Sequence, residues 1–214
     1  MHSRLFGFFK STFIALVSVI VFALVASTAQ AAQTIVVYGD SLSAAYGIPP
    51  NTGWVALLEN KLKQQNNAYK VINASISGET TSGGLTRFAQ MLKTHQPKIV
   101  VIELGANDGL RGLSLNDMQS NLNSMITQAK AKNATVMLLG MKIPPNYGIQ
   151  YTQKFSAIYE NLAKQYKLSL VPFFLDGVAG NRTLVQDDGL HPTAAAQPKL
   201  LENIWPKLES LLKK

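Results

Sequence analysis

Short apolar runs alternate along the chain with segments whose apolar residues recur every three or four positions. The runs predict strands at 34–38, 69–73, 98–104, 134–140 and 168–172. The recurring segments predict helices at 54–65, 85–94, 116–130, 151–166 and 193–212. We expect the polar, glycine-containing stretches 77–84 and 107–114 to be loops. An alternation of strand and helix is typical of one parallel sheet with helices on both faces.

Polar residues follow several of these predicted strands. Gly39-Asp40-Ser41 comes directly after the first strand, Ser77-Gly78 follows the second, and Asn107 follows the third. Asp188-Gly189-Leu190-His191 lies just before the last predicted helix. The carboxyl ends of parallel strands meet at one edge of the sheet, where ligand sites form. We therefore expect these segments to converge on one site.

Ser41 and His191 are the candidates for a nucleophile and its base. A serine hydroxyl is a weak nucleophile at neutral pH and needs a neighbouring base. Asp188, three residues before His191, can reach the ring, fix its tautomer and leave Nε2 facing the serine. Asp187 is the alternative carboxylate, and the spacing favours Asp188. His95 ends a predicted helix beside a proline, which is typical of a surface residue.

Acyl transfer also requires hydrogen-bond donors around the oxygen that becomes negatively charged. The candidates are the backbone N–H groups of Ser41 and Gly78 and the side-chain amide of Asn107. Glycine at position 78 lets the backbone approach a ligand closely. Asn107 follows the central predicted strand, so its amide can point into the site. Taken singly, Gly78 and Asn107 also fit ordinary turns.

The first residues have the composition of a secretory signal peptide. Arg4 and Lys10 are basic, and residues 11–25 are uncharged and mostly apolar. Ala29-Gln30-Ala31 fits a cleavage site of small residues. We expect cleavage after Ala31, a single domain over residues 32–214, and a periplasmic or secreted protein. The alternative is that this segment remains as an uncleaved membrane anchor.

The composition excludes several kinds of chemistry and partner. The chain has no cysteine, which rules out a thiol nucleophile, a thiolate metal site and disulfides. Its formal net charge of +8 either attracts anionic substrates and lipid headgroups or reflects a generic basic surface. The sequence contains no block of Lys and Arg residues of the kind that would indicate nucleic acid binding. We expect a monomer with transient contact to membrane surfaces, a small or lipid acyl ester as substrate, and neither metal nor cofactor.

The polar motifs lie within longer characteristic stretches, which are 39–44, 73–78, 104–112, 144–148 and 186–192. This pattern resembles the SGNH (GDSL-type) hydrolase superfamily, whose invariant letters would fall on Ser41, Gly78, Asn107 and His191. The longer stretches resemble its branch of multifunctional acyl-CoA thioesterase I, lysophospholipase L1, protease I and arylesterase proteins. The resemblance covers the chain after the leader.

The resemblance implies a flavodoxin-like three-layer α/β/α sandwich with a five-stranded parallel sheet. It implies an exported serine esterase that hydrolyses carboxylic esters and thioesters through an acyl-enzyme on Ser41. The substrate would contact a loop at 109–114 and an acyl groove. The residues implied for these contacts are Gly109, Leu110, Arg111, Ile143, Pro145 and Tyr147. A carbohydrate O-deacetylase of the same superfamily and a non-catalytic exported binding module are the alternatives.

Overall fold

The computed structural model describes residues 33–65 and 67–213. The predicted leader, its cleavage site after Ala31 and the alternative membrane anchor all lie outside the described residues. Within those residues, no helix combines the length and the apolar composition that crossing a membrane requires.

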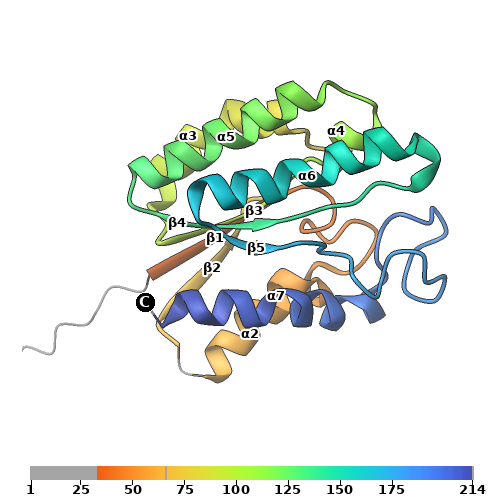
Figure 1. Ribbon diagram of the computed structural model, residues 1–214. Helices are drawn as coiled ribbons and strands as arrows, with labels where there is room; N and C mark the ends of the chain where they lie inside the picture. The colour runs from red at the N-terminus through yellow and green to blue at the C-terminus, as the bar shows by residue number, and fades with distance from the viewer. Residues whose placement is uncertain (1–32, 66, 214) are drawn as a thin grey trace, which may run out of the picture. The chain divides into compact units, whose positions relative to one another are not determined.

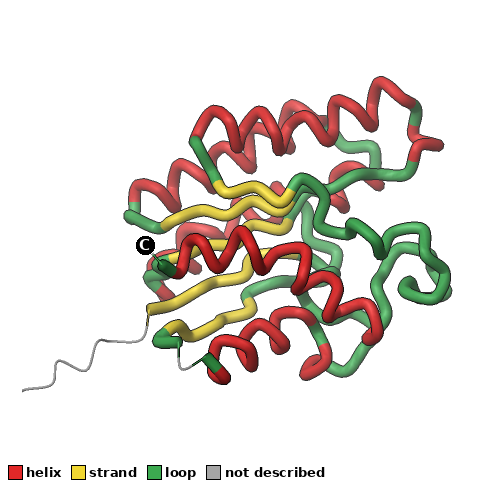
Figure 2. The backbone as a smooth tube through the Cα atoms, turned by 60° about the horizontal axis from the view of Figure 1, so that its bottom comes forward, coloured by secondary structure: helices red, strands yellow, loops and turns green. Residues whose placement is uncertain are grey.

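A parallel sheet forms the middle layer of the domain (Figure 2). Its strands lie in the order β2-β1-β3-β4-β5, which is the flavodoxin-like order. Their bounds are β1 Gln33–Gly39, β2 Tyr69–Asn73, β3 Ile99–Glu103, β4 Thr135–Leu139 and β5 Ser169–Val171. All residues of β3 are buried, as its almost continuous apolar sequence predicts for a central strand. The five-stranded parallel sheet expected from the sequence is confirmed.

Helices cover both faces of the sheet. Figure 1 shows α3, α5 and α6 on one face and α2 and α7 on the other, which confirms the three-layer sandwich. The α-helices are α2 Trp54–Gln64, α3 Thr81–His95, α4 Ala106–Leu110, α5 Leu115–Ala131, α6 Ile149–Tyr166 and α7 Gln197–Leu212. Short 3-10 turns are η1 Pro50–Thr52, η2 Pro145–Tyr147 and η3 Ala194–Ala196.

Two of the expected loops are wrong in part, because helices begin inside them. α3 begins at Thr81, since the side chain of Thr80 accepts a hydrogen bond from the N–H of Gly83 and caps the helix. α4 lies within the stretch expected to be a loop. It follows Gly105, whose φ of 116° favours glycine. Both helices therefore start at the carboxyl edge of the sheet, beside the polar motifs.

Aromatic contacts hold the helices against the sheet on both faces. Tyr38 of β1 meets Phe88 of α3 edge-on, with ring centroids 5.0 Å apart. Trp54 at the start of α2 meets Phe174, which follows β5, at 5.6 Å. All four rings are fully buried. Because Tyr38 and Phe174 lie close to the ends of their strands, these contacts also fix the edge from which the polar segments leave.

Gly140, directly after β4, provides a test of how tightly this edge is packed. A Cβ at this position would lie 2.5 Å from the carbonyl oxygen of Pro172, which is a backbone atom and cannot rotate away. We expect Gly140→Ala to lower the free energy of unfolding by about 1–3 kcal/mol, the usual cost of overpacking. Urea unfolding of the two proteins measures this difference. An unchanged midpoint and slope would show that the edge relaxes more freely than its packing indicates.

Candidate active site

Ser41 lies in a tight turn that leaves the end of β1. The N–H groups of Ser43 and Ala44 both donate to the carbonyl of Asp40, which folds the chain back on itself. Gly39 is required just before this turn, because a Cβ there would lie 2.5 Å from a carboxylate oxygen of Glu103. The turn leaves Ser41 partly exposed at the carboxyl edge of the sheet.

The structure brings Ser41, His191 and Asp188 into one hydrogen-bonded chain. Nε2 of His191 lies 2.9 Å from Oγ of Ser41, and its Nδ1 lies 2.6 Å from Oδ2 of Asp188. The other carboxylate oxygen of Asp188 accepts from the N–H groups of Leu190 and His191. Burial acts to raise the pKa of Asp188, but the hydrogen bonds from His191 and Leu190 prevail and lower it to about 2. Asp188 is therefore a carboxylate at neutral pH.

The structure distinguishes Asp188 from Asp187 and His191 from His95. Within the described residues, Asp187 is exposed and makes no hydrogen bond to His191. His95 lies in the last turn of α3, at the opposite edge of the sheet from Ser41. The ring of Tyr46, which the sequence analysis did not single out, packs against His191 with centroids 4.5 Å apart.

Gln186 ties the segment that carries His191 to the turn that carries Ser41. Its side-chain amide donates to the carbonyl of Tyr46 at 2.8 Å and to that of Pro192 at 3.0 Å. Its backbone N–H donates to the carbonyl of His191 at 2.7 Å. These bonds hold the histidine segment beside the serine.

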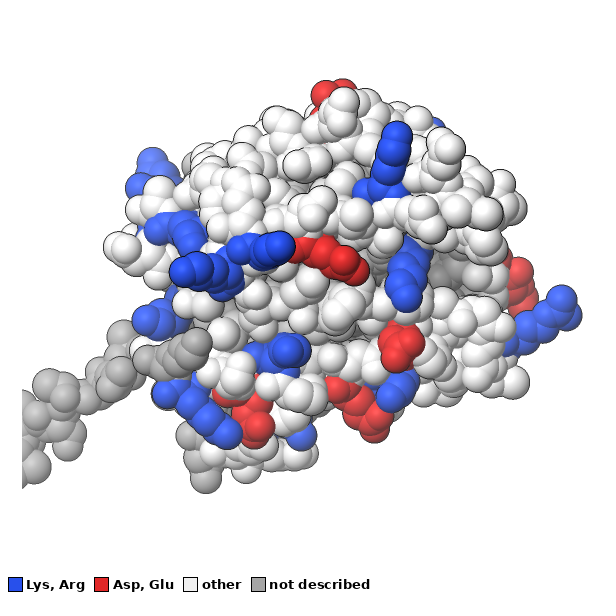
Figure 3. Space-filling model, in the orientation of Figure 1, with Lys and Arg blue, Asp and Glu red and all other residues white. Residues whose placement is uncertain are grey.

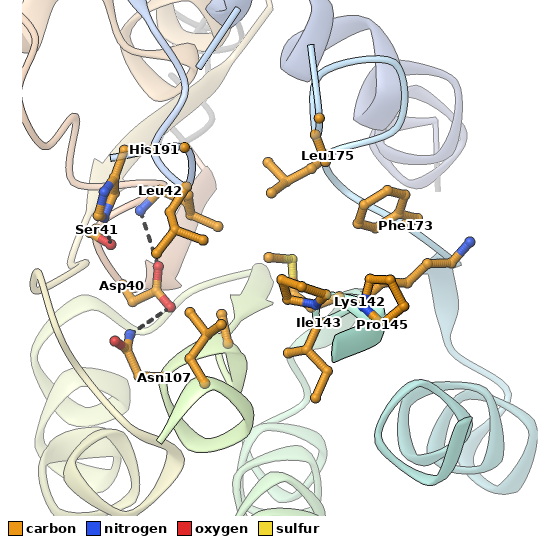
Figure 4. A pocket seen from close by; sticks show the side chains of 18 residues that line it. Asp40, Ser41, Leu42, Asn107, Lys142, Ile143, Pro145, Phe173, Leu175 and His191 are labelled. Carbon is orange, nitrogen blue, oxygen red and sulfur yellow. Dashed lines mark hydrogen bonds between the residues drawn. The ribbon is translucent and has the colours of Figure 1, made fainter. Parts of the chain in front are cut away.

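The three predicted oxyanion donors differ in their availability. Among the described residues, the N–H groups of Ser41 and Gly78 donate to no protein acceptor. Gly78 has a φ of 78°, a conformation that favours glycine. The amide of Asn107 donates to Oδ2 of Asp40 at 3.0 Å, which Figure 4 shows, and to the carbonyl of Glu79, also at 3.0 Å. Both of its hydrogens are therefore engaged.

A pair of buried carboxyl groups lies beneath the serine turn. Oε2 of Glu103 accepts from Oγ of Ser43 at 2.8 Å and from the N–H of Asp40 at 3.3 Å. Burial raises the pKa of Asp40 to about 6. Burial, and then the charge of Asp40, also raise the pKa of Glu103 well above its ordinary value. Glu103 was not predicted as a site residue from the sequence, where its only signal is an acidic residue at the end of an apolar strand.

An apolar pocket of about 540 Å³ opens beside Ser41 and His191. Figure 4 shows Ile143, Phe173 and Leu175 facing the serine and histidine from across the pocket. Leu110, Ile143 and Pro145, for which the resemblance implies contact with substrate, line it. Several lining residues that follow β4 and β5 were not predicted from the sequence. These are Met141, Lys142, Phe173 and Leu175. Their positions just after strands are the signal that could have found them.

The structure does not place Gly109, Arg111 or Tyr147 among the residues that line the pocket. Gly109 is buried against α6, where a Cβ would lie 2.6 Å from the ring of Phe155. A guanidinium nitrogen of Arg111 donates to the carbonyl of Gly78 at 3.0 Å. The hydroxyl of Tyr147 donates to the carbonyl of Leu110 at 2.9 Å. The structure shows these three residues holding the loops around the pocket, and their contact with substrate stays a prediction.

The described part of the chain contains no group of three or more His, Cys, Asp or Glu side chains arranged to hold a metal ion. The chemistry that this arrangement supports is nucleophilic attack by a serine on an acyl carbon. A base lies beside the serine, the N–H groups of Ser41 and Gly78 donate to no acceptor among the described residues, and an apolar pocket opens next to the serine.

A family model and the sequences of known proteins both match most of this chain. Residues 37–197 match the GDSL-like lipase/acylhydrolase family. Esterase TesA from Pseudomonas aeruginosa is 53% identical over 89% of this chain and 95% of its own. Thioesterase 1/protease 1/lysophospholipase L1 from Escherichia coli is 42% identical over 86% of this chain and 87% of its own.

Solved structures agree with these relatives. A crystal structure of TesA superposes with a TM-score of 0.82 at 52% identity, covering 84% of this chain and 99% of that one. The psychrotrophic esterase EstA from Pseudoalteromonas gives 0.81 at 40% identity, covering 85% of this chain and all of that one.

The buried carboxyl pair predicts an unusual dependence of stability on pH. Between the ordinary pKa of 3.8 and about 6, folded Asp40 keeps a proton that the unfolded chain has released. Unfolding then releases protons, so these groups make the free energy of unfolding fall as the pH rises. Glu103→Gln removes one such group and the charge beside the other, so we expect a smaller fall. Urea unfolding across this pH window measures it.

The exposed Glu160→Gln on α6 is the matched control and should follow the wild type. A Glu103→Gln protein that keeps the slope of the wild type would show that the pair does not titrate in this window.

Proposed function

The chain belongs to the GDSL-like lipase/acylhydrolase family and is an ester hydrolase, and from this premise we propose that it forms an acyl-enzyme on Ser41. The observation that carries the proposal is the chain of contacts from Ser41 Oγ through His191 to Asp188, at 2.9 and 2.6 Å. Distances of this length allow a proton to pass between serine and imidazole.

In the first half of the reaction, Oγ of Ser41 bonds to the carbonyl carbon of the ester and its proton passes to Nε2 of His191. Asp188, ionised and bonded to the ring, stabilises the imidazolium that forms. The carbonyl oxygen becomes an oxyanion. When the bond to the leaving oxygen or sulfur breaks, the same proton passes from Nε2 to the leaving group. Water then attacks the acyl-enzyme by the reverse path, which regenerates Ser41 and releases the acid.

The N–H groups of Ser41 and Gly78 supply two donors to the oxyanion. Asn107 supplies a third when its amide exchanges the carbonyl of Glu79 for the substrate oxygen and keeps its bond to Asp40. Asp40 thereby orients the amide during the exchange. One such donor is worth roughly 3–4 kcal/mol of transition-state stabilisation in comparable sites.

The substrates we propose are carboxylic esters and thioesters with apolar acyl groups. The support is the apolar wall of Ile143, Phe173 and Leu175 opposite the serine, which suits a hydrocarbon chain better than a sugar. Relatives described as an esterase, an arylesterase and a thioesterase support the same range. We also propose that the enzyme acts after export, in the periplasm or outside the cell. The support is the sequence of residues 1–31.

A fluorophosphonate probe tests the proposed nucleophile. We expect the wild type to be labelled at Ser41 and Ser41→Ala to be unlabelled, because only the serine beside His191 is activated. Mass spectrometry of the labelled peptide locates the modification. Ser82→Ala, which removes an exposed hydroxyl on α3, is the matched control and should label like the wild type. Labelling of Ser41→Ala would contradict the mechanism.

Two neighbouring carboxylates test the orientation of the base. Asp188→Asn offers an amide to Nδ1 of His191 and favours the wrong tautomer, so we expect kcat on a soluble ester to fall by about 10³–10⁴-fold. Asp187→Asn alters an exposed carboxylate that makes no hydrogen bond to the ring among the described residues and should change kcat little. Equal losses in the two variants would refute the assignment of Asp188.

A further inference from the structure

Large apolar side chains that are exposed gather at one edge of the domain. Among the described residues, every exposed large hydrophobic side chain lies at the carboxyl edge of the sheet, and Ile149 is the most exposed at 72%. We call this set the apolar rim. Its members are Tyr46, Ile76, Leu113, Tyr147, Ile149 and Leu190. Scattered exposed hydrophobic residues are ordinary, but a cluster at one place marks a surface that binds something.

The apolar rim is continuous with the pocket. Leu190 lines the pocket beside His191, and Tyr46 packs against the ring of His191. The hydroxyl of Tyr147 donates to the carbonyl of Leu110, another lining residue. Ile149 follows Tyr147 at the start of α6. The pocket therefore opens beside this part of the rim, and a surface that sits on these residues also covers the way to Ser41.

This geometry restricts the kind of partner. A folded protein seated on the rim would close the pocket against substrate, whereas an aggregated lipid would supply its own acyl chains to the pocket it covers. We infer that the apolar rim docks the enzyme onto the surface of aggregated acyl lipid, and that the substrate passes from that surface into the pocket. The inference rests on the proposed esterase function and names the physical state of the substrate.

The distribution of charge offers a second surface for docking, the basic edge, and the two modes of docking depend differently on lipid charge and salt. Lysines precede or begin several strands at the opposite, amino edge of the sheet, and all of them are exposed. These are Lys70, Lys98, Lys132 and Lys167. Figure 3 shows Lys and Arg gathered on the left of the domain, where this edge lies. Docking through the basic edge would require anionic lipid, would weaken in salt and would point the pocket away from the lipid. Docking through the rim would persist with zwitterionic lipid and in salt.

The test replaces two rim residues that neither line the pocket nor contact the triad. Ile76→Ser/Ile149→Ser removes apolar surface, and Ile76→Val/Ile149→Val is the matched control that keeps it. The full-length gene product is purified in the form into which the cell processes it, so all variants share one N-terminus. Three quantities are measured. They are turnover of a soluble short-chain ester, turnover of a lysophospholipid below and above its critical micelle concentration, and binding to vesicles of non-hydrolysable diether phosphatidylcholine.

We expect the serine variant to bind the vesicles on the order of tenfold more weakly and to lose activity on micelles to a similar extent, because binding scales with buried apolar area. Its turnover of the soluble ester should match that of the wild type, and the valine variant should match the wild type throughout. Unchanged vesicle binding in the serine variant would overturn the inference. So would binding that vanishes in salt and in Lys98→Gln/Lys132→Gln, because the basic edge would then be the docking surface.

Three further outcomes are distinct. A wild type that forms a dimer, which the serine variant dissociates, would show that the rim joins two copies of the chain. A wild type that hydrolyses no soluble ester would refute the proposed function itself. Hydrolysis of the soluble ester without binding to vesicles would refute only the docking inference.

Discussion

The hydrogen bonds accepted by buried Glu103 hold the catalytic turn to the centre of the sheet. One carboxylate oxygen at the end of β3 receives both the N–H of Asp40 and the hydroxyl of Ser43, on either side of Ser41. The position of the serine therefore depends on a residue of the neighbouring strand. Asp40 extends this arrangement to Asn107, which follows the same strand. These hydrogen bonds join the turn after β1 to the end of β3 and the segment that follows it, and they set the positions of Ser41 and of one candidate oxyanion donor.

Few contacts are needed to position the site residues, because the sheet is parallel. Every strand delivers its following segment to the same edge, so Ser41, Gly78 and Asn107 arrive together without long connections. The histidine segment comes from further along the chain and needs its own fastening, which Gln186 supplies. Apolar residues after β4 and β5 complete the pocket on the far side. The proposed nucleophile and oxyanion donors thus follow β1, β2 and β3, and the apolar wall opposite them follows β4 and β5.

Much of the fold and of the candidate site was predictable from the sequence, because the strands and the Asp188–His191 contact depend on residues that are close along the chain. The apolar runs predicted each strand of the sheet, and the spacing of Asp188 and His191 predicted a contact that closes within one turn. The start of α3 was missed because the cap by Thr80 lies in a stretch that resembles a loop. The binding of Glu103 to Ser43 was missed because it joins strands that are distant in sequence. The hydrogen bonds of Arg111 to Gly78 and of Tyr147 to Leu110 were not predicted for the same reason, since a motif fixes neighbours along the chain and not which way a loop turns.

The proposed base His191 and the carboxylate of Asp188 share one four-residue turn, and this has a consequence for heat inactivation. Within the turn, Asp188 holds His191 through both the ring and the backbone, so the pair keeps its geometry wherever the segment lies. The segment that carries the pair is held beside the serine turn by the hydrogen bond from the Gln186 amide to Tyr46 and by the packing of Tyr46 against His191. Local opening of that segment on warming would carry the intact pair away from Ser41 while the sheet stays folded. The temperature at which the enzyme stops working would then report the stability of a surface segment, and cooling would restore activity without refolding.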